Sequence, residues 1–127
     1  EHKLKNIQYF PYGSWNEDTV ISFAQNQESS GIDIDGQKKL QVYKLDTLLK
    51  GRKVTLVKIN FLNGVEETLQ GATDILREQK PKLAITVGFD QWGIIRIPQT
   101  IKRINSYYKI YFRYAASMPA RLILYAC

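Results

Sequence analysis

The sequence predicts an α/β fold in which a mixed sheet contains a strand–helix–strand (βαβ) unit and ends in an antiparallel hairpin. Two nearly continuous apolar runs, Val54–Ile59 and Leu83–Val87, are typical of strands covered on both faces. A helical pattern separates them, so the two strands should be parallel, with a right-handed crossover. We expect a single domain over residues 1–127, with a β-rich part (1–50) and a βαβ part that ends in the hairpin (51–127).

The first part of the chain shows alternating strand and turn patterns. Asn6–Phe10 is a short apolar run that a turn at Gly13–Ser14 should close, and Thr19–Ala24 is a second strand. Residues 25–37 are polar and rich in Gly, Ser and Asp, so they predict a loop or a wide turn. Leu40–Leu45 alternates apolar and polar residues, as a half-buried strand does.

The helix of the βαβ unit is predicted from an apolar stripe at helical spacing. The stripe consists of Val65, Leu69, Ala72 and Leu76. Asn63 and Glu66 stand three positions apart and suit a capping box at its start, and Pro81 should end it. The sequence therefore predicts one helix that connects the two buried strands.

The remaining elements are a loop, a helix and two strands. GFDQWGIIR (residues 88–96) predicts the loop, and Pro98 suits the first turn of the helix. Tyr107–Tyr114 alternates and Arg121–Ala126 is apolar, so these runs should pair as a hairpin around a turn at 115–120.

The run YYKIYFRY admits two interpretations. Aromatic residues interleaved with basic ones can bind single-stranded nucleic acid. An ordinary strand explains the same alternation, with one aromatic face buried and with Lys109 and Arg113 turned to solvent. We favour the strand and expect no nucleic-acid partner, because the chain contains no block of consecutive basic residues.

Composition excludes several classes of site. The chain carries a net charge of +6, one cysteine and one histidine. Cys127 alone forms no internal disulfide, and His2 alone excludes a His-based triad or a two-His metal site, so we predict no metal. No apolar run is long enough to span a membrane, and the N-terminus lacks a leader pattern. We therefore expect a cytoplasmic protein with no membrane partner.

Ligands of open α/β sheets bind beyond the carboxyl ends of the strands. Two loops meet that condition, and together they offer the polar or aromatic residues Asn60, Asn63, Asp90 and Trp92. The alternative is that Asn63 only caps a helix and Trp92 only packs. The sequence contains no glycine-rich phosphate loop, and Asp33 and Asp35 lack the rest of a calcium loop.

VTLVKINFLNGVEETLQGATDILREQKPKLAITV (residues 54–87) resembles the FkbM-like S-adenosylmethionine-dependent methyltransferases, whose pattern is KIDVEGAE, then LKGA, then KPKLAI. The matching residues are Lys58, Ile59, Leu69, Gly71, Ala72, Pro81, Lys82, Leu83, Ala84 and Ile85. YGSWNEDTVISF (12–23) is similar to the family's GAW…G…F segment, and LDTLL (45–49) to its LDdll. IPQTIKRINSYYKIYFRY and LILYA resemble its closing segments, so the likeness spans the whole chain.

The resemblance implies a partial Rossmann-like class I methyltransferase fold that uses S-adenosylmethionine, with Ser14 and Trp15 near the cofactor's adenine edge. It covers the second half of such a domain. The family's cofactor-binding strands and glycine-rich loop have no counterpart, so we expect the isolated chain neither to bind the cofactor nor to be active. At four positions where family members carry ionisable residues, this chain has Asn60, Leu62, Val65 and Phe89.

Two functions follow as hypotheses. The chain is the C-terminal half of a methyltransferase that modifies a hydroxyl or similar acceptor, with its catalytic residues unknown. Alternatively it is a degenerate, non-catalytic interaction or scaffold module. Because an open sheet edge recruits other strands, the second hypothesis predicts a homodimer through the exposed edge.

Overall fold

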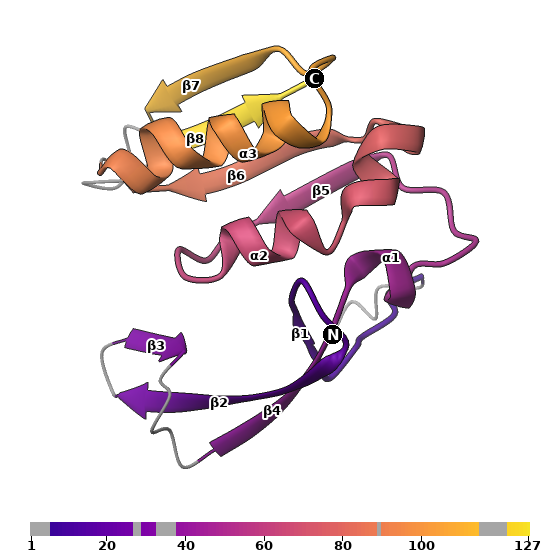
Figure 1. The fold of residues 1–127 in the computed structure, drawn as a ribbon, viewed down its shortest axis with the longest axis vertical. Coiled ribbons are helices and arrows are strands. Elements are labelled where there is room, and N and C mark those ends of the chain that lie inside the picture. Colours follow the sequence, from indigo (N-terminus) through magenta and orange to yellow (C-terminus); the bar gives the residue numbers. More distant parts are fainter. Residues whose placement is uncertain (1–5, 27–28, 33–37, 89, 115–121) are drawn as a thin grey trace.

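The computed structural model describes residues 6–26, 29–32, 38–88, 90–114 and 122–127. Within these residues the strands form two four-stranded sheets, and the helices lie between the sheets and against the second sheet (Figure 1). The mixed α/β character predicted from the sequence is therefore confirmed, although the strands divide between two sheets.

The N-terminal sheet has the strand order β1-β4-β2-β3. Its strands are β1 (Gly13–Ser14), β2 (Thr19–Asn26), β3 (Ser29–Ile32) and β4 (Lys38–Tyr43). β2 is antiparallel to β3 and β4, whereas β1 is parallel to β4. Gly13 allows this pairing, because a Cβ there would lie 2.8 Å from a methyl group of Val42.

Three predictions for this part are wrong. Residues 6–10 are not a strand, whereas the predicted turn Gly13–Ser14 pairs with β4. The predicted loop 25–37 contains the end of β2 and all of β3. A sheet ladder is made by backbone groups, so polar residues can form one when a neighbouring strand is available.

The C-terminal sheet has the strand order β5-β6-β8-β7. Its strands are β5 (Leu56–Ile59), β6 (Lys82–Val87), β7 (Ile110–Tyr114) and β8 (Leu122–Ala126). β5 and β6 are parallel, and β8 is antiparallel to both β6 and β7. The βαβ unit and the terminal hairpin are thus confirmed, while the predicted turn at 115–120 lies outside the described residues.

Five helical segments connect the described strands. They are α1 (Leu45–Leu48), α2 (Val65–Gln70), the π-helical η1 (Ile75–Gln79) and η2 (Trp92–Arg96), and α3 (Ile97–Ile104). The single helix predicted after β5 is divided at Gly71 into α2 and a second segment. The carboxylate of Asp46 accepts hydrogen bonds from the backbone N–H groups of Asp74 and Ile75, both at 3.0 Å, and so caps the second segment.

The predicted capping box at the start of α2 is wrong. Gly64 occupies the N-cap position with φ 86°, a left-handed conformation that favours glycine, and no side chain caps the helix. Glu66 instead accepts a hydrogen bond from the hydroxyl of Thr100 on α3. α2 therefore begins at Val65, and its first acidic residue is directed toward α3.

Residues 88–96 are not one continuous loop, because η2 occupies Trp92–Arg96 and continues into α3. Pro98 lies in the first turn of α3, as expected. The additional helix carries Trp92 and Arg96 to the side of α2, which brings both residues to the site described below.

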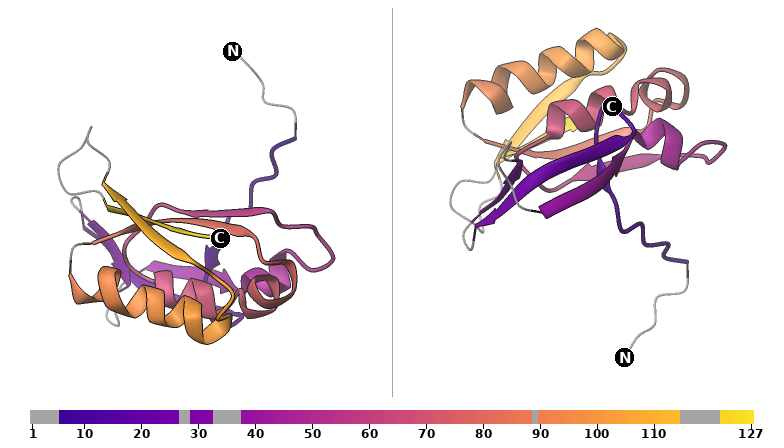
Figure 2. Two further views of the ribbon diagram at one scale, coloured as in Figure 1. Left: turned by 90° about the horizontal axis from the view of Figure 1, so that it is seen from above. Right: turned by 60° about the horizontal axis from the view of Figure 1, so that its bottom comes forward.

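The main core lies between the C-terminal sheet and the helices α2 and α3, which share one face of it (Figure 2). Its fully buried members include Leu69, Leu76, Leu83, Ile85, Ile101, Tyr108 and Leu124. The phenol of Tyr108 donates a buried hydrogen bond of 2.8 Å to the carbonyl of Pro81. No helix among the described residues covers the opposite face, and Leu56 is 60% exposed there. The prediction that β5 is covered on both faces is therefore wrong for this structure.

Candidate functional site

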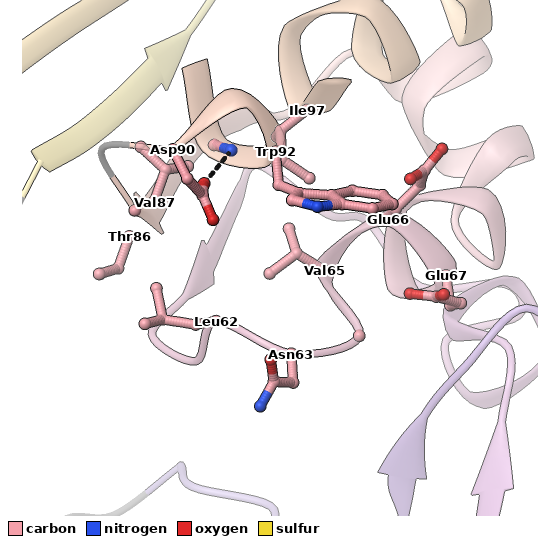
Figure 3. Close-up of a pocket in the computed structure, with 13 residues that line it drawn as sticks. Leu62, Asn63, Val65, Glu66, Glu67, Thr86, Val87, Asp90, Trp92 and Ile97 are labelled. Carbon is pink, nitrogen blue, oxygen red and sulfur yellow. Dashed lines mark hydrogen bonds between the residues drawn. The ribbon is translucent and has the colours of Figure 1, made fainter. Parts of the chain in front are cut away.

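A pocket of about 490 Å³ lies at the carboxyl ends of β5 and β6 (Figure 3). It is lined by Leu62, Asn63, Gly64, Val65, Glu66, Glu67, Thr86, Val87, Gly88, Asp90, Trp92, Gly93 and Ile97. This is the edge at which the sequence predicts a site, because parallel strands bring the loops that follow them together. Val65, Val87 and Ile97 are buried, so the floor is apolar.

Asp90 contributes a carboxylate from the loop after β6. Its Oδ1 accepts the backbone N–H of Gly93 at 3.0 Å, which fixes the side chain at one end of the pocket. Gly93 is required for this geometry, since a Cβ on it would collide with the backbone of Gly88. The predicted place of Asp90 at this edge agrees with the pocket lining.

Trp92 forms one wall of the pocket and contacts a charged residue, Arg96, that also pairs with Glu66. The guanidinium of Arg96 lies over its ring, 4.1 Å from the centroid, and also lies 3.6 Å from the carboxylate of Glu66. Thr100 donates a hydrogen bond of 3.1 Å to the other oxygen of Glu66. Arg96 thus holds the indole by a cation–π contact and offsets the charge of Glu66.

The two asparagines predicted at this edge have different roles. Asn63 is exposed and lines the pocket, and it does not cap α2. Asn60 does not belong to the described lining, because its Oδ1 accepts a hydrogen bond of 2.9 Å from the hydroxyl of Thr86. Asn60 therefore ties the end of β5 to the end of β6.

Glu66 and Glu67 are site residues that the sequence argument missed. Four ionisable positions of the resembling family are replaced at this edge, yet three carboxylates line the pocket, from Glu66, Glu67 and Asp90. Glu66 and Glu67 lie in the first turn of α2, where acidic residues complement the helix dipole. The sequence signal that could have identified these two residues is their position in the helix that follows the end of β5.

Ser14 and Trp15 lie elsewhere. The hydroxyls of Ser14 and Thr68 are 2.9 Å apart, and the carbonyl of Trp15 packs against Gly71. Both residues join the N-terminal sheet to α2, and neither lines the described pocket. Phe89, Asp33 and Asp35 lie outside the described residues.

In the part of the chain that the structure describes, no group of three or more His, Cys, Asp and Glu side chains could hold a metal ion. None of the helices described is long and apolar enough to cross a membrane.

Comparisons with known proteins give a match at the level of structure. No family model matches the chain, and no curated protein matches it. The chain is similar to the crystal structure of methyltransferase FkbM from Methylobacillus flagellatus KT, with a TM-score of 0.63 and 24% sequence identity. The fold is that of part of an FkbM methyltransferase. The match covers 70% of this chain and 24% of that chain, so this chain corresponds to about a quarter of its length.

Several observations bear on whether these residues fit S-adenosylmethionine. The sequence has no glycine-rich loop, and the two residues expected beside the adenine, Ser14 and Trp15, are engaged with α2. The pocket presents carboxylates and an amide around an apolar floor. Arg96, which pairs with Glu66 and lies over the ring of Trp92, is not part of the described lining. Neither a glycine-rich loop nor Ser14 or Trp15 contributes to the described pocket. The carboxylates and the amide of the pocket suit a neutral or cationic molecule with hydrogen-bond donors.

Proposed function

We propose that this chain forms the acceptor side of an FkbM-like, S-adenosylmethionine-dependent methyltransferase domain and is inactive in isolation. The observation that carries the proposal is the pocket at the carboxyl ends of β5 and β6, in a chain whose fold is similar to part of an FkbM methyltransferase. Ligand sites of open α/β sheets lie at this edge.

The proposed work of this chain is to hold and orient the molecule that receives the methyl group. The carboxylates of Asp90 and Glu67 accept hydrogen bonds from hydroxyl or amine groups, and the amide of Asn63 can both donate and accept. Val65 and the ring of Trp92 contact its apolar part. Fixing the acceptor in this way supplies the positioning component of catalysis.

The cofactor would be held by further strands, joined to the edge of β5 that faces away from β6. Among the described strands, β6 is the only one that pairs with β5, so the other edge of β5 is unpaired in this part of the chain. An unpaired strand edge presents a row of backbone donors and acceptors to a neighbouring strand. Supplying these strands, from the same gene or a partner chain, should create S-adenosylmethionine binding that the isolated chain lacks.

Two measurements test the proposal. The coding sequence upstream of Glu1, or a neighbouring gene, should encode a strand, a glycine-rich loop and a helix. A polypeptide containing that segment and this chain should transfer label from methyl-labelled S-adenosylmethionine to hydroxyl-bearing acceptors, and Asp90→Asn should weaken acceptor use. Asp74→Asn is the matched control, because it makes the same change at an exposed carboxylate outside the described lining. Absence of such a segment, together with no labelling by the chain, would favour the second candidate.

The second candidate is a degenerate, non-catalytic module that forms a homodimer through the open edge of β5. The exposed edge and the 60% exposure of Leu56 support it, because such edges recruit other chains. Sedimentation should then show twice the chain mass of 14.7 kDa, and Leu56→Lys should return the protein to the monomer. A compact monomer at high concentration would contradict this candidate.

A further inference from the structure

The pocket at the carboxyl ends of β5 and β6 is acidic, although the chain as a whole is basic. The chain carries a net charge of +6. Among the described residues that line the pocket, Glu66, Glu67 and Asp90 carry a charge, and none is a lysine, an arginine or a histidine. The sign of the pocket is therefore opposite to the sign of the chain.

Arg96 offsets one of these three carboxylates. Its guanidinium lies 3.6 Å from Oε2 of Glu66, and no other ion pair involves the three carboxylates among the described residues. Glu67 and Asp90 thus have no cation beside them in this part of the chain. Charges of one sign in a cleft with apolar walls attract ligands of the opposite sign. The pocket therefore favours a cation.

The two uncompensated carboxylates come from different elements. Asp90 lies in the loop after β6, and its Oδ1 accepts the N–H of Gly93 at 3.0 Å, which holds the carboxylate in place and leaves Oδ2 for a ligand. Glu67 lies in the first turn of α2. Figure 3 shows Val65 and the indole of Trp92 between the two carboxylates. The pocket thus combines a fixed anionic group with an apolar centre.

On the basis of the proposed function, we propose that the acceptor is a small amino alcohol whose protonated amino group binds to Asp90. An ammonium group donates hydrogen bonds and accepts none, so it matches a carboxylate oxygen. A hydrogen bond between two ionised groups is also roughly twice as strong as one between neutral groups. Glu67 adds attraction from the other side of the pocket, and the carbon skeleton contacts Val65 and Trp92. An anionic acceptor meets charges of its own sign.

Two-dimensional NMR of the chain with three matched probes tests the proposal. The probes are aminocyclohexanol, cyclohexanediol and hydroxycyclohexanecarboxylate, all as trans isomers substituted at opposite ring carbons. They share a ring and a hydroxyl group, and they differ in the charge of the second group. The amino alcohol should shift the resonances of residues 62–67 and 90–93. The diol should bind about tenfold more weakly, because it lacks the charge-assisted hydrogen bond. The hydroxy acid should not bind at this site.

Three variants assign the preference to individual carboxylates. Asp90→Asn keeps an oxygen for the N–H of Gly93 but removes the charge, so the preference for the amino alcohol over the diol should fall to about twofold or less. Glu67→Gln should reduce the preference by a smaller factor. Glu78→Gln is the matched control, because it changes an exposed carboxylate outside the described lining, and it should leave the preference unchanged. The spectra also show whether each variant is folded.

Four results would overturn the proposal. Equal binding of the diol would remove the amine preference and leave the acceptor pocket in place. Tighter binding of the hydroxy acid would reverse the sign of the site. Amino alcohol binding that Asp90→Asn does not weaken would indicate general attraction to the surface. If no probe binds, the amine site is refuted, and label transfer to hydroxyl-bearing acceptors by the assembled domain then decides the proposed function separately.

Discussion

The carbonyl oxygen of Trp15 occupies the space where Gly71 would carry a Cβ atom. The Cα of Lys44 also lies 3.2 Å from that position. Gly71 ends α2, so this contact presses the backbone of the N-terminal part directly against the βαβ part. The N–H of Asp46 donates a hydrogen bond of 2.9 Å to the carbonyl of Gly71 beside it. This close approach determines how the two parts fit together.

Replacing Gly71 with alanine should therefore destabilise the protein. The new methyl group meets backbone atoms that cannot rotate away, and overpacking of this kind costs about 1–3 kcal/mol. Urea unfolding followed by circular dichroism measures the loss. Gly88→Ala is the matched control, because the nearest atom to its new methyl group would belong to a side chain, that of Asp90 at 3.3 Å, and not to the backbone. Equal stability of the two variants would contradict the close contact.

Asp46 should stabilise the segment that follows Gly71. Asp46→Ala removes the acceptor for the N–H groups of Asp74 and Ile75, and the loss of a helix cap costs about 1–2 kcal/mol. Asp74→Ala changes an exposed carboxylate whose backbone N–H is retained, so its effect should be smaller. Hydrogen exchange should localise the Asp46→Ala effect to residues 73–79. Equal hydrogen-exchange protection of residues 73–79 in the two variants would contradict this role of Asp46.

Tyr108→Phe should cost about 1–2 kcal/mol in the free energy of unfolding. The substitution keeps the ring in the core but removes the 2.8 Å hydrogen bond to the buried carbonyl of Pro81, which then has no donor in its place. Tyr107→Phe is the control, because Tyr107 is 60% exposed. Denaturant titration at neutral pH distinguishes the two, and equal midpoints would show that the hydrogen bond contributes nothing.

The same phenol should make stability depend on alkaline pH. Burial raises the pKa of Tyr108 from 10.0 to about 12, with a smaller contribution from Tyr107. Below pH 10 both states are protonated and the stabilisation is complete. Between pH 10 and 12 the unfolded state loses its proton first, so about 2 kcal/mol is lost. The difference between wild type and Tyr108→Phe should shrink across this range, and a constant difference would contradict the assignment.

Arg96→Ala should change the surroundings of Trp92 far more than it changes stability. The ion pair with Glu66 is partly exposed, so it and the cation–π contact together contribute about 1 kcal/mol. Removing the guanidinium 4.1 Å from the ring should alter the indole emission. The change should vanish in a Trp92→Phe background, since Trp15 would then be the reporter. A change that persists there would place the effect at Trp15.

The apolar and alternating runs predicted the strands of the C-terminal sheet and their pairing as a βαβ unit and a hairpin. The predicted buried aromatic face of β7 is wrong, because Phe112 is 39% and Tyr114 is 59% exposed. The resemblance of residues 54–87 to FkbM methyltransferases agrees with the fold found by structural comparison. Asn63, Asp90 and Trp92 line the pocket at the edge where the sequence predicts a site, and their role there stays a prediction.

The predictions that failed depended on contacts distant in sequence. The break at Gly71 is set by Trp15 and Asp46, which no local pattern around α2 reveals. Glu66 was predicted to cap α2, but its carboxylate contacts Thr100 and Arg96 instead. The helical segment η2, which carries Arg96, was predicted as a loop. Ser14 was assigned to a cofactor by resemblance, yet its hydroxyl meets Thr68. Side-chain partners across the fold could not be deduced from spacing alone.

Calorimetric titration of S-adenosylmethionine tests the central claim most directly. The account places the acceptor pocket in this chain and the cofactor site in strands that would join β5. It predicts no heat of binding for the 127-residue chain and clear binding once those strands are supplied. Micromolar binding by the isolated chain would contradict it, because the described residues would then hold the cofactor themselves.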